Sequence, residues 1–261
     1  MVNELIIYVA DAGSVSKKNF HWVCSRDISA SSSDPEELAR SVAGDLAHQI
    51  PVALGYECPL FMPVEIEKGL LGRARKGECE AATGNRSFSA GAGASILATG
   101  VPSLAWVLRK IKELNPNVSA TTRWSDFKNG KHKLFVWEAF VTGSEKAFPP
   151  SHVGDARLAI SAFQQEYSKA DIPTRVTCTS AFSLAGTAII WAELSGDLSL
   201  LFEPCVVVRP IFSEAESKKR ILDFKLRQAE SRILKAKKAA LKNKPKKATR
   251  KGKPKGPKYG E

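Results

Sequence analysis

The stretch LIIYVADAGSVSKKNFHWV, residues 5–23, decides the fold. A run of mostly β-branched or aliphatic residues reaches one carboxylate, Asp11, turns through Gly13 and Ser14, and returns as residues 19–24. This pattern predicts a buried strand, a turn and an antiparallel return strand. Asp11 is therefore expected at a sheet edge, beside a glycine that lets backbone or a ligand approach closely.

The next segment predicts a helix and then a second strand parallel to the first. Asp34 as N-cap, Pro35 at the first helical position and Glu37 three residues after the cap form a capping box for a helix of 16 residues. For residues 25–33 the sequence allows two interpretations, a short third strand or a loop. The strand of residues 51–56 ends on Glu57, and sites in open α/β sheets gather at such carboxyl ends.

Composition bounds the chain to one domain with a tail. It has 261 residues, 43% of them hydrophobic, and a formal charge of +12. Residues 213–261 contain 18 Lys+Arg and 5 Asp+Glu, which leaves 21 against 22 in residues 1–212. The body is therefore nearly neutral, and we expect the C-terminal arm to capture any polyanion.

Several classes of protein are disfavoured by what the sequence lacks. It has no apolar run of about 18 residues and no secretory leader pattern, which predicts a soluble, cytoplasmic protein without membrane partners. The five cysteines are scattered, with no C-x-x-C, and the four histidines show no metal-ligand spacing. Neither a disulfide framework nor a zinc site is expected.

The middle of the chain is expected to be an irregular insertion, residues 64–100. It contains a basic stretch and the small-residue run SAGAGAS, residues 89–95, which is either close packing at a helix start or a loop whose amides approach phosphate. No Gly-Lys-Ser/Thr follows, so it is not a P-loop. Apolar spacing then predicts a helix over residues 103–114.

A third carboxylate is predicted on a late helix. The aromatic and β-branched run KLFVWEAFVT, residues 133–142, predicts a strand with Glu138 in its interior. Ser151 is an N-cap for the next helix, on which Asp155 shares the apolar face and His152 lies nearly one turn earlier. Residues 180–193 predict a further helix, and residues 203–209 a last strand.

The segments VADAGS, GYECPLF, RSFSAGAGA, HVGDA and LFEPC, in this order, resemble a known superfamily. The chain resembles the ribonuclease H-like superfamily, in particular the RuvC-type resolvases, whose acids come from the first strand, the end of the fourth strand and a late helix. It is most similar to an uncharacterised branch of predicted ribonuclease H-like nucleases. The resemblance covers about residues 5–210, and His152 replaces a fourth acid that some members carry.

This resemblance implies an α/β, three-layer ribonuclease H-like fold, a mixed central sheet flanked by helices, in residues 1–212. It also implies hydrolysis of phosphodiester bonds in DNA or RNA with two Mg²⁺ or Mn²⁺ ions. Asp11 would bridge the ions, Glu57 and Asp155 would each bind one, and His152 would be a ligand or a proton donor. Hard cations prefer carboxylate oxygens, which is consistent with these residue types.

Each residue also has a structural interpretation. Asp11 could form an Asx turn, Glu57 could be solvated at a strand end, and Asp155 could accept from helix-start amides. Glu138 is more often a salt-bridged strand residue than an accessory acid. Cys58, next to Glu57, raises the alternative of a thiol nucleophile, but no histidine is fixed beside it by sequence.

Nucleic acid is the expected partner. Residues 213–240 predict a basic amphipathic helix, and residues 241–261 a disordered Lys-rich tail. The predicted contacts are Arg86, Lys235, Lys237, Lys238, Lys246, Lys247, Arg250 and Lys251.

One alternative function is that of a non-catalytic nucleic-acid-binding or scaffold protein. A sugar kinase or actin-like ATPase would need a second Asp-x-Gly, which the sequence lacks. The oligomeric state is open, with a homodimer as one option.

Overall fold

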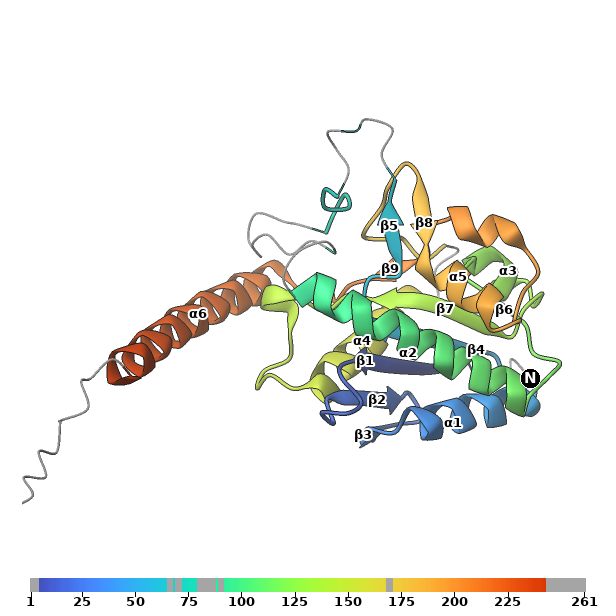
Figure 1. Ribbon diagram of the computed structural model, residues 1–261, viewed down its shortest axis with the longest axis horizontal. Helices are drawn as coiled ribbons and strands as arrows, with labels where there is room; N and C mark the ends of the chain where they lie inside the picture. Colours follow the sequence, from blue (N-terminus) through green and yellow to red (C-terminus); the bar gives the residue numbers. More distant parts are fainter. Residues whose placement is uncertain are drawn as a thin grey trace, which may run out of the picture. The chain divides into compact units, whose positions relative to one another are not determined.

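The computed structural model describes residues 5–64, 68, 72–78, 88, 92–167 and 171–242 (Figure 1). The chain divides into two compact units, residues 1–221 and residues 222–261. The first unit contains an α/β fold with a mixed sheet. The second contains most of helix α6, Glu214–Lys242.

Within the described ranges, seven strands form the central sheet, in the order β3-β2-β1-β4-β7-β6, and β9 also pairs with β7. Strands β1, β4, β7, β6 and β9 are parallel, while β2 is antiparallel to β1 and β3 to β2. The bounds are β1 Ile6–Ala12, β2 Phe20–Cys24, β3 Asp27–Ser32, β4 Val52–Glu57, β6 Ala120–Thr121, β7 Leu134–Ala139 and β9 Val207–Val208.

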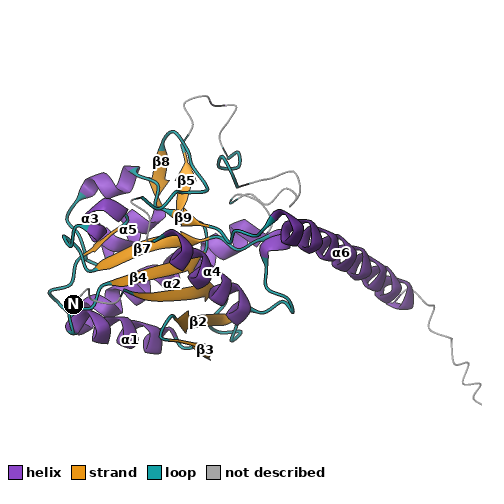
Figure 2. Ribbon diagram, turned by 180° about the vertical axis from the view of Figure 1, so that it is seen from behind, coloured by secondary structure: helices purple, strands orange, loops and turns teal. Residues whose placement is uncertain are grey.

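Helices cover both faces of this sheet, as the two views show (Figures 1 and 2). One core packs the sheet against α1 (Pro35–Ala47), α2 (Ala92–Leu114) and α5 (Leu184–Trp191). The other packs it against α3 (Trp124–Lys128) and α4 (His152–Glu166). A second, two-stranded sheet pairs β5 (Phe61–Pro63) with β8 (Ala181–Ser183). Two 3₁₀ turns, Gly143–Glu145 and Leu198–Phe202, complete the elements used below.

Alternation along the strands decides which carboxylate faces which layer. In β1, Ile6, Tyr8 and Ala10 enter the core under α1 and α2, whereas Ile7 and Val9 enter the core under α4. Because successive side chains alternate between faces, Asp11 lies on the α4 side with Ile7 and Val9. The same parity places Glu57 on the α4 side and Glu138 on the opposite side.

The structure confirms the predicted hairpin, the parallel second strand and the late helix. Residues 25–33 contain strand β3, which answers the question that the sequence left open. The Asp34 carboxylate caps α1 by accepting from the Glu36 amide. The predicted capping box forms differently, because Glu37 accepts from the Ser32 hydroxyl and that hydroxyl in turn accepts from the Asp34 amide.

Several predicted bounds were wrong. Helix α1 ends at Ala47 and has 13 residues rather than 16. Helix α2 begins at Ala92, eleven residues earlier than expected, and runs through Pro102, so the end of the SAGAGAS run is a helix start. Residues 92–100 are therefore helical and do not belong to the irregular insertion predicted over residues 64–100. Residues 89–91 of that run lie outside the described residues. Helix α5 begins only at Leu184, after β8. The last strand, expected over residues 203–209, is two residues long, because β9 pairs with β7 only at Val207–Val208.

Candidate metal centre

Asp11 and Glu57 lie side by side at the carboxyl ends of two parallel strands. They are register partners in the β1–β4 pair, and both side chains face α4. The turn after Asp11 is held by Ser14, whose carbonyl accepts from the amides of Lys17 and Asn19. Gly13 packs against the backbone of Asn19 with no room for a Cβ, so its small size serves chain packing. Asp11 therefore does not carry the turn.

Asp155 reaches the same place from the first turn of α4. Ser151 caps this helix by accepting from the Gly154 amide, as predicted. Asp155 is 3% exposed, and its Oδ1 accepts from the Ala147 amide at 2.7 Å. One carboxylate oxygen from each of Asp11, Glu57 and Asp155 lies within 4.8 Å of the others. The fold thus gathers the three predicted acids into one cluster.

Lys146 inserts into this acidic cluster. Its Nζ lies 2.7 Å from Asp155 Oδ2 and 3.4 Å from Glu57 Oε1. Burial lowers the pKa of Lys146, but the charges of Glu57 and Asp155 raise it by more, so its pKa lies above the ordinary value. The amine is therefore protonated at neutral pH and offsets part of the acidic charge.

Glu57 is the least satisfied of the three acids. Burial, followed by the charge of Asp11, raises the pKa of Glu57 well above its ordinary value. Its Oε2 is buried and has no hydrogen-bond partner among the described residues. Because Glu57 is 9% exposed, it is not a solvated strand end. A buried carboxylate oxygen without a donor is expensive unless the group binds a cation or takes up a proton.

His152 pairs with Asp11. Its Nδ1 lies 2.7 Å from Asp11 Oδ2, and because an ionised carboxylate only accepts, Nδ1 carries the donated proton. In the tautomer that carries only this proton, Nε2 is an acceptor. His21, opposite Asp11 on β2, stacks on His152 with ring centroids 5.8 Å apart and an interplanar angle of 14°.

The cluster fits a hard divalent cation. Its donors are carboxylate oxygens from two strands and a helix, which are the ligands that Mg²⁺ and Mn²⁺ prefer. Three carboxylates this close repel one another, and Lys146 supplies only one positive charge. The buried Glu57 Oε2 adds a donor atom that the described protein groups leave unused.

Glu138 belongs to a separate centre on the other face of the sheet. Arg75 binds both its oxygens at 2.7 Å and also Glu78 at 3.2 Å, and the Leu60 amide donates to Glu138 Oε2 at 2.9 Å. The salt-bridged interpretation of Glu138 is therefore confirmed. Cys58 is 3% exposed and burial raises the pKa of its thiol, which removes the thiolate that a nucleophile needs.

A cavity of about 510 Å³ lies beside the turn that precedes Lys146. It is lined by Ser144 and Glu145 and by three arginines, Arg175, Arg209 and Arg220. Each arginine contacts a carboxylate, from Glu166, Glu145 and Glu216 respectively. The positive charges of these three arginines are therefore balanced by carboxylates.

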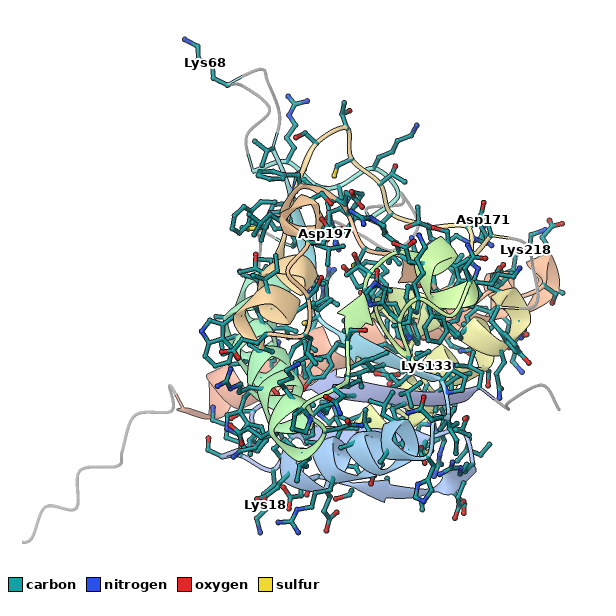
Figure 3. The ribbon with its side chains drawn as sticks, turned by 90° about the vertical axis from the view of Figure 1, so that its right-hand side faces the viewer. Lys18, Lys68, Lys133, Asp171, Asp197 and Lys218 are labelled. Atoms are coloured by element: carbon teal, nitrogen blue, oxygen red, sulfur yellow. The ribbon has the colours of Figure 1, made fainter. Side chains whose placement is uncertain are left out.

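The predicted nucleic-acid contacts are only partly described. Lys235 is exposed on α6, and Lys237 and Lys238 lie on the same helix with side chains outside the described set. Arg86, Lys246, Lys247, Arg250 and Lys251 lie outside the described residues, as does the tail from residue 243. Lys18 and Lys68 are exposed at the periphery (Figure 3).

Sequence reasoning missed Lys146 and His21. Lys146 follows a 3₁₀ turn and precedes Pro149, so no periodicity indicates where its side chain points. Its signal is only its place, nine residues before Asp155. His21 could have been found from the hairpin, because a return strand paired along its length brings one of its residues opposite Asp11.

No family model, no curated protein and no solved structure matches this chain. Among the helices of the described ranges, none combines the length and apolar character that crossing a membrane requires.

Proposed function

We propose that this protein is a metal-dependent nuclease that hydrolyses phosphodiester bonds in DNA or RNA on a ribonuclease H-like fold. One observation carries the proposal: Asp11, Glu57 and Asp155 converge within 4.8 Å from β1, the end of β4 and α4. These are the first strand, the end of the fourth strand and a late helix, which are the positions that the sequence resemblance implies for the acids.

The three carboxylates would hold the cation, Mg²⁺ or Mn²⁺. When bound, it supplies Lewis acidity that makes water acidic near neutral pH and stabilises charge on oxygen. The water oxygen joins phosphorus as the bond to the leaving sugar oxygen breaks. His152 Nε2 accepts the water proton, and solvent protonates the leaving oxygen. This step assigns His152 as a proton acceptor at Nε2, while its Nδ1–H stays bonded to Asp11.

The basic C-terminal arm, which consists of α6 and residues 243–261, would bind the phosphates of the nucleic acid. Residues 243–261 contain eight Lys and Arg residues, and α6 adds exposed cations such as Lys235. Binding through such residues is insensitive to base sequence and weakens with salt, by a logarithmic slope of about −0.9 per neutralised phosphate on duplex DNA. Deleting residues 243–261 should flatten this slope and leave metal binding unchanged.

Cleavage by an Asp11→Asn variant tests the proposal. Labelled single- and double-stranded DNA and RNA are incubated with Mn²⁺ or Mg²⁺, and products are resolved by length. The wild type should cleave at least one substrate, and Asp11→Asn should lose about 10²-fold or more of that rate. Asp171→Asn, which changes an exposed carboxylate, is the matched control (Figure 3). Equal cleavage by Asp11→Asn and wild type would refute the mechanism.

A specific observation also supports the second candidate, a non-catalytic nucleic-acid-binding protein. Asp155 is already bonded by Lys146 and the Ala147 amide, and Asp11 by His152, so two of the three acids are satisfied by the protein itself. This candidate requires that Mn²⁺ fail to bind while nucleic acid is still retained through the arm. Calorimetric Mn²⁺ titration beside a filter-binding assay separates the two functions.

A further inference from the structure

Lys146 is held inside the acidic cluster by contacts with the rest of the fold. Its side chain is two-thirds buried, and its ammonium lies between Asp155 and Glu57 at 2.7 and 3.4 Å. The next residue, Ala147, donates its amide to the other oxygen of Asp155 at 2.7 Å. Asp155 is therefore held by two consecutive residues of one segment, which fixes where the ammonium can lie.

Contacts on both sides hold the backbone that carries Lys146. On one side, Arg220 Nη1 donates to the Lys146 carbonyl at 3.3 Å, and Arg209 Nη2 binds Glu145 Oε1 at 2.6 Å. On the other, Gly154 packs so closely against Ala147 that an added Cβ would overlap the Ala147 methyl group. A lysine anchored in this way differs from the exposed Lys17 and Lys18 of the hairpin turn.

Charge balance sets how many divalent ions the cluster can take. When a metal binds, its carboxylate ligands are deprotonated. Three ionised carboxylates and the Lys146 ammonium then leave a net charge of −2, which a single divalent ion neutralises. A second divalent ion would make the site positive and would approach the ammonium, and repulsion between cations is strong in a buried site. With Lys146 in place, the cluster therefore favours one ion.

We propose that Lys146 is the second cation of this centre, so that the cluster of Asp11, Glu57 and Asp155 binds one divalent ion and not the two that the resemblance implies. The inference rests on the proposed function and specifies its metal content. Lys146 then does part of the work of a second metal, because its ammonium neutralises Asp155 and Glu57 and can donate hydrogen bonds to a phosphate oxygen.

Mn²⁺ stoichiometry tests the inference without reference to activity. Calorimetry counts the bound ions, and electron paramagnetic resonance shows whether two ions are coupled as a close pair. The wild type should bind one uncoupled Mn²⁺. Lys146→Met should bind two coupled ions, with affinity for the first ion higher on the order of tenfold because a neighbouring positive charge is gone. Lys146→Arg keeps the charge and should bind one.

The control is Lys133→Met, which removes the lysine that precedes β7 and is labelled in Figure 3. It lies at the end of the β4–β7 pair opposite to Glu57. The Lys133→Met variant should match the wild type. Circular dichroism checks folding, and Lys146→Gln replaces Lys146→Met if that variant does not fold. Two coupled ions in the wild type, or one ion with unchanged affinity in Lys146→Met, would overturn the role of Lys146 and leave the nuclease proposal standing. No Mn²⁺ in any variant would refute the metal-dependent function itself.

Discussion

Two buried acidic centres lie at the carboxyl ends of neighbouring parallel strands, on opposite faces of one sheet. Glu138, on β7, has both oxygens bound by Arg75 and accepts from the Leu60 amide. Glu57, on β4, shares one Lys146 ammonium with Asp155 and keeps a buried oxygen without a described donor. We call the first centre complete because the protein bonds both oxygens of its carboxylate, although Arg75 Nε is buried without a described partner. We call the second centre incomplete because Glu57 Oε2 is a buried carboxylate acceptor without a described donor. This difference separates a structural carboxylate from a candidate ligand.

The largest expected effect comes from breaking the complete centre. Arg75→Met leaves Glu138 and Glu78 buried without their guanidinium, which should reduce the free energy of unfolding by roughly 3–5 kcal/mol. Urea denaturation monitored by tryptophan fluorescence measures the change. The control Arg40→Met breaks an exposed ion pair with Glu36 and should have little effect. A loss below about 1 kcal/mol for Arg75→Met would contradict the structural role of this centre.

The second effect concerns the hairpin that positions Asp11. Gly13→Ala forces a methyl group onto the backbone of Asn19, which should lower the free energy of unfolding by about 1–3 kcal/mol and weaken Mn²⁺ binding together with it. Gly44→Ala in α1 is the matched control, because an added Cβ there meets no neighbour and alanine favours the helix. Chemical denaturation and calorimetry follow both properties. Unchanged Mn²⁺ affinity in a destabilised Gly13→Ala protein would show that the hairpin does not position the ligand.

Much of this contrast could be predicted from the sequence. Strand alternation and the Gly-Ser turn predict where Asp11 lies, and the Asp34-Pro35 helix start predicts a parallel strand ending on Glu57. Ser151 and the helical spacing predict that Asp155 points inward. These signals are local, because each depends on the repeat of one element or on one cap.

The remaining features depend on contacts between distant segments. Arg75 lies in a basic stretch with no periodicity, and nothing in that stretch indicates that it meets Glu138 across the chain. The direction of the Lys146 side chain depends on packing in the same way, because Lys146 lies in a loop. So does the length of α2, because a proline inside a helix is tolerated only where packing stabilises it. Side chains alternate between the two faces along β7, so Glu138 could have been excluded from the cluster if the register of β7 with β4 had been known.

The third effect tests the incomplete centre directly. Glu57→Gln removes a charge that burial and Asp11 disfavour, so in EDTA at pH 7 it should raise the free energy of unfolding, on the order of 1 kcal/mol. Thermal denaturation with and without Mn²⁺ measures it. The wild type should gain stability when Mn²⁺ is added, and Glu57→Gln should gain little, because a neutral amide is a poorer ligand. Destabilisation of Glu57→Gln in EDTA would mean that Glu57 is satisfied without metal, like Glu138.

The smallest expected effect on stability comes from an exposed ion pair, Asp197–Arg123, in contrast to the two buried centres. A hydrogen bond from the Ser199 hydroxyl and then one from Arg123 lower the pKa of Asp197 to about 2. Because this pKa lies below the ordinary 3.8, the interaction stabilises the fold above pH 3.8 and is lost as the pH falls from 3.8 towards 2. Carboxyl NMR titration should show the pKa of Asp197 rising in Arg123→Ala, with little change in stability at pH 7, since solvent screens exposed charges. A large loss of stability at pH 7 would instead implicate the second partner of Arg123, Glu203, as part of a structural network.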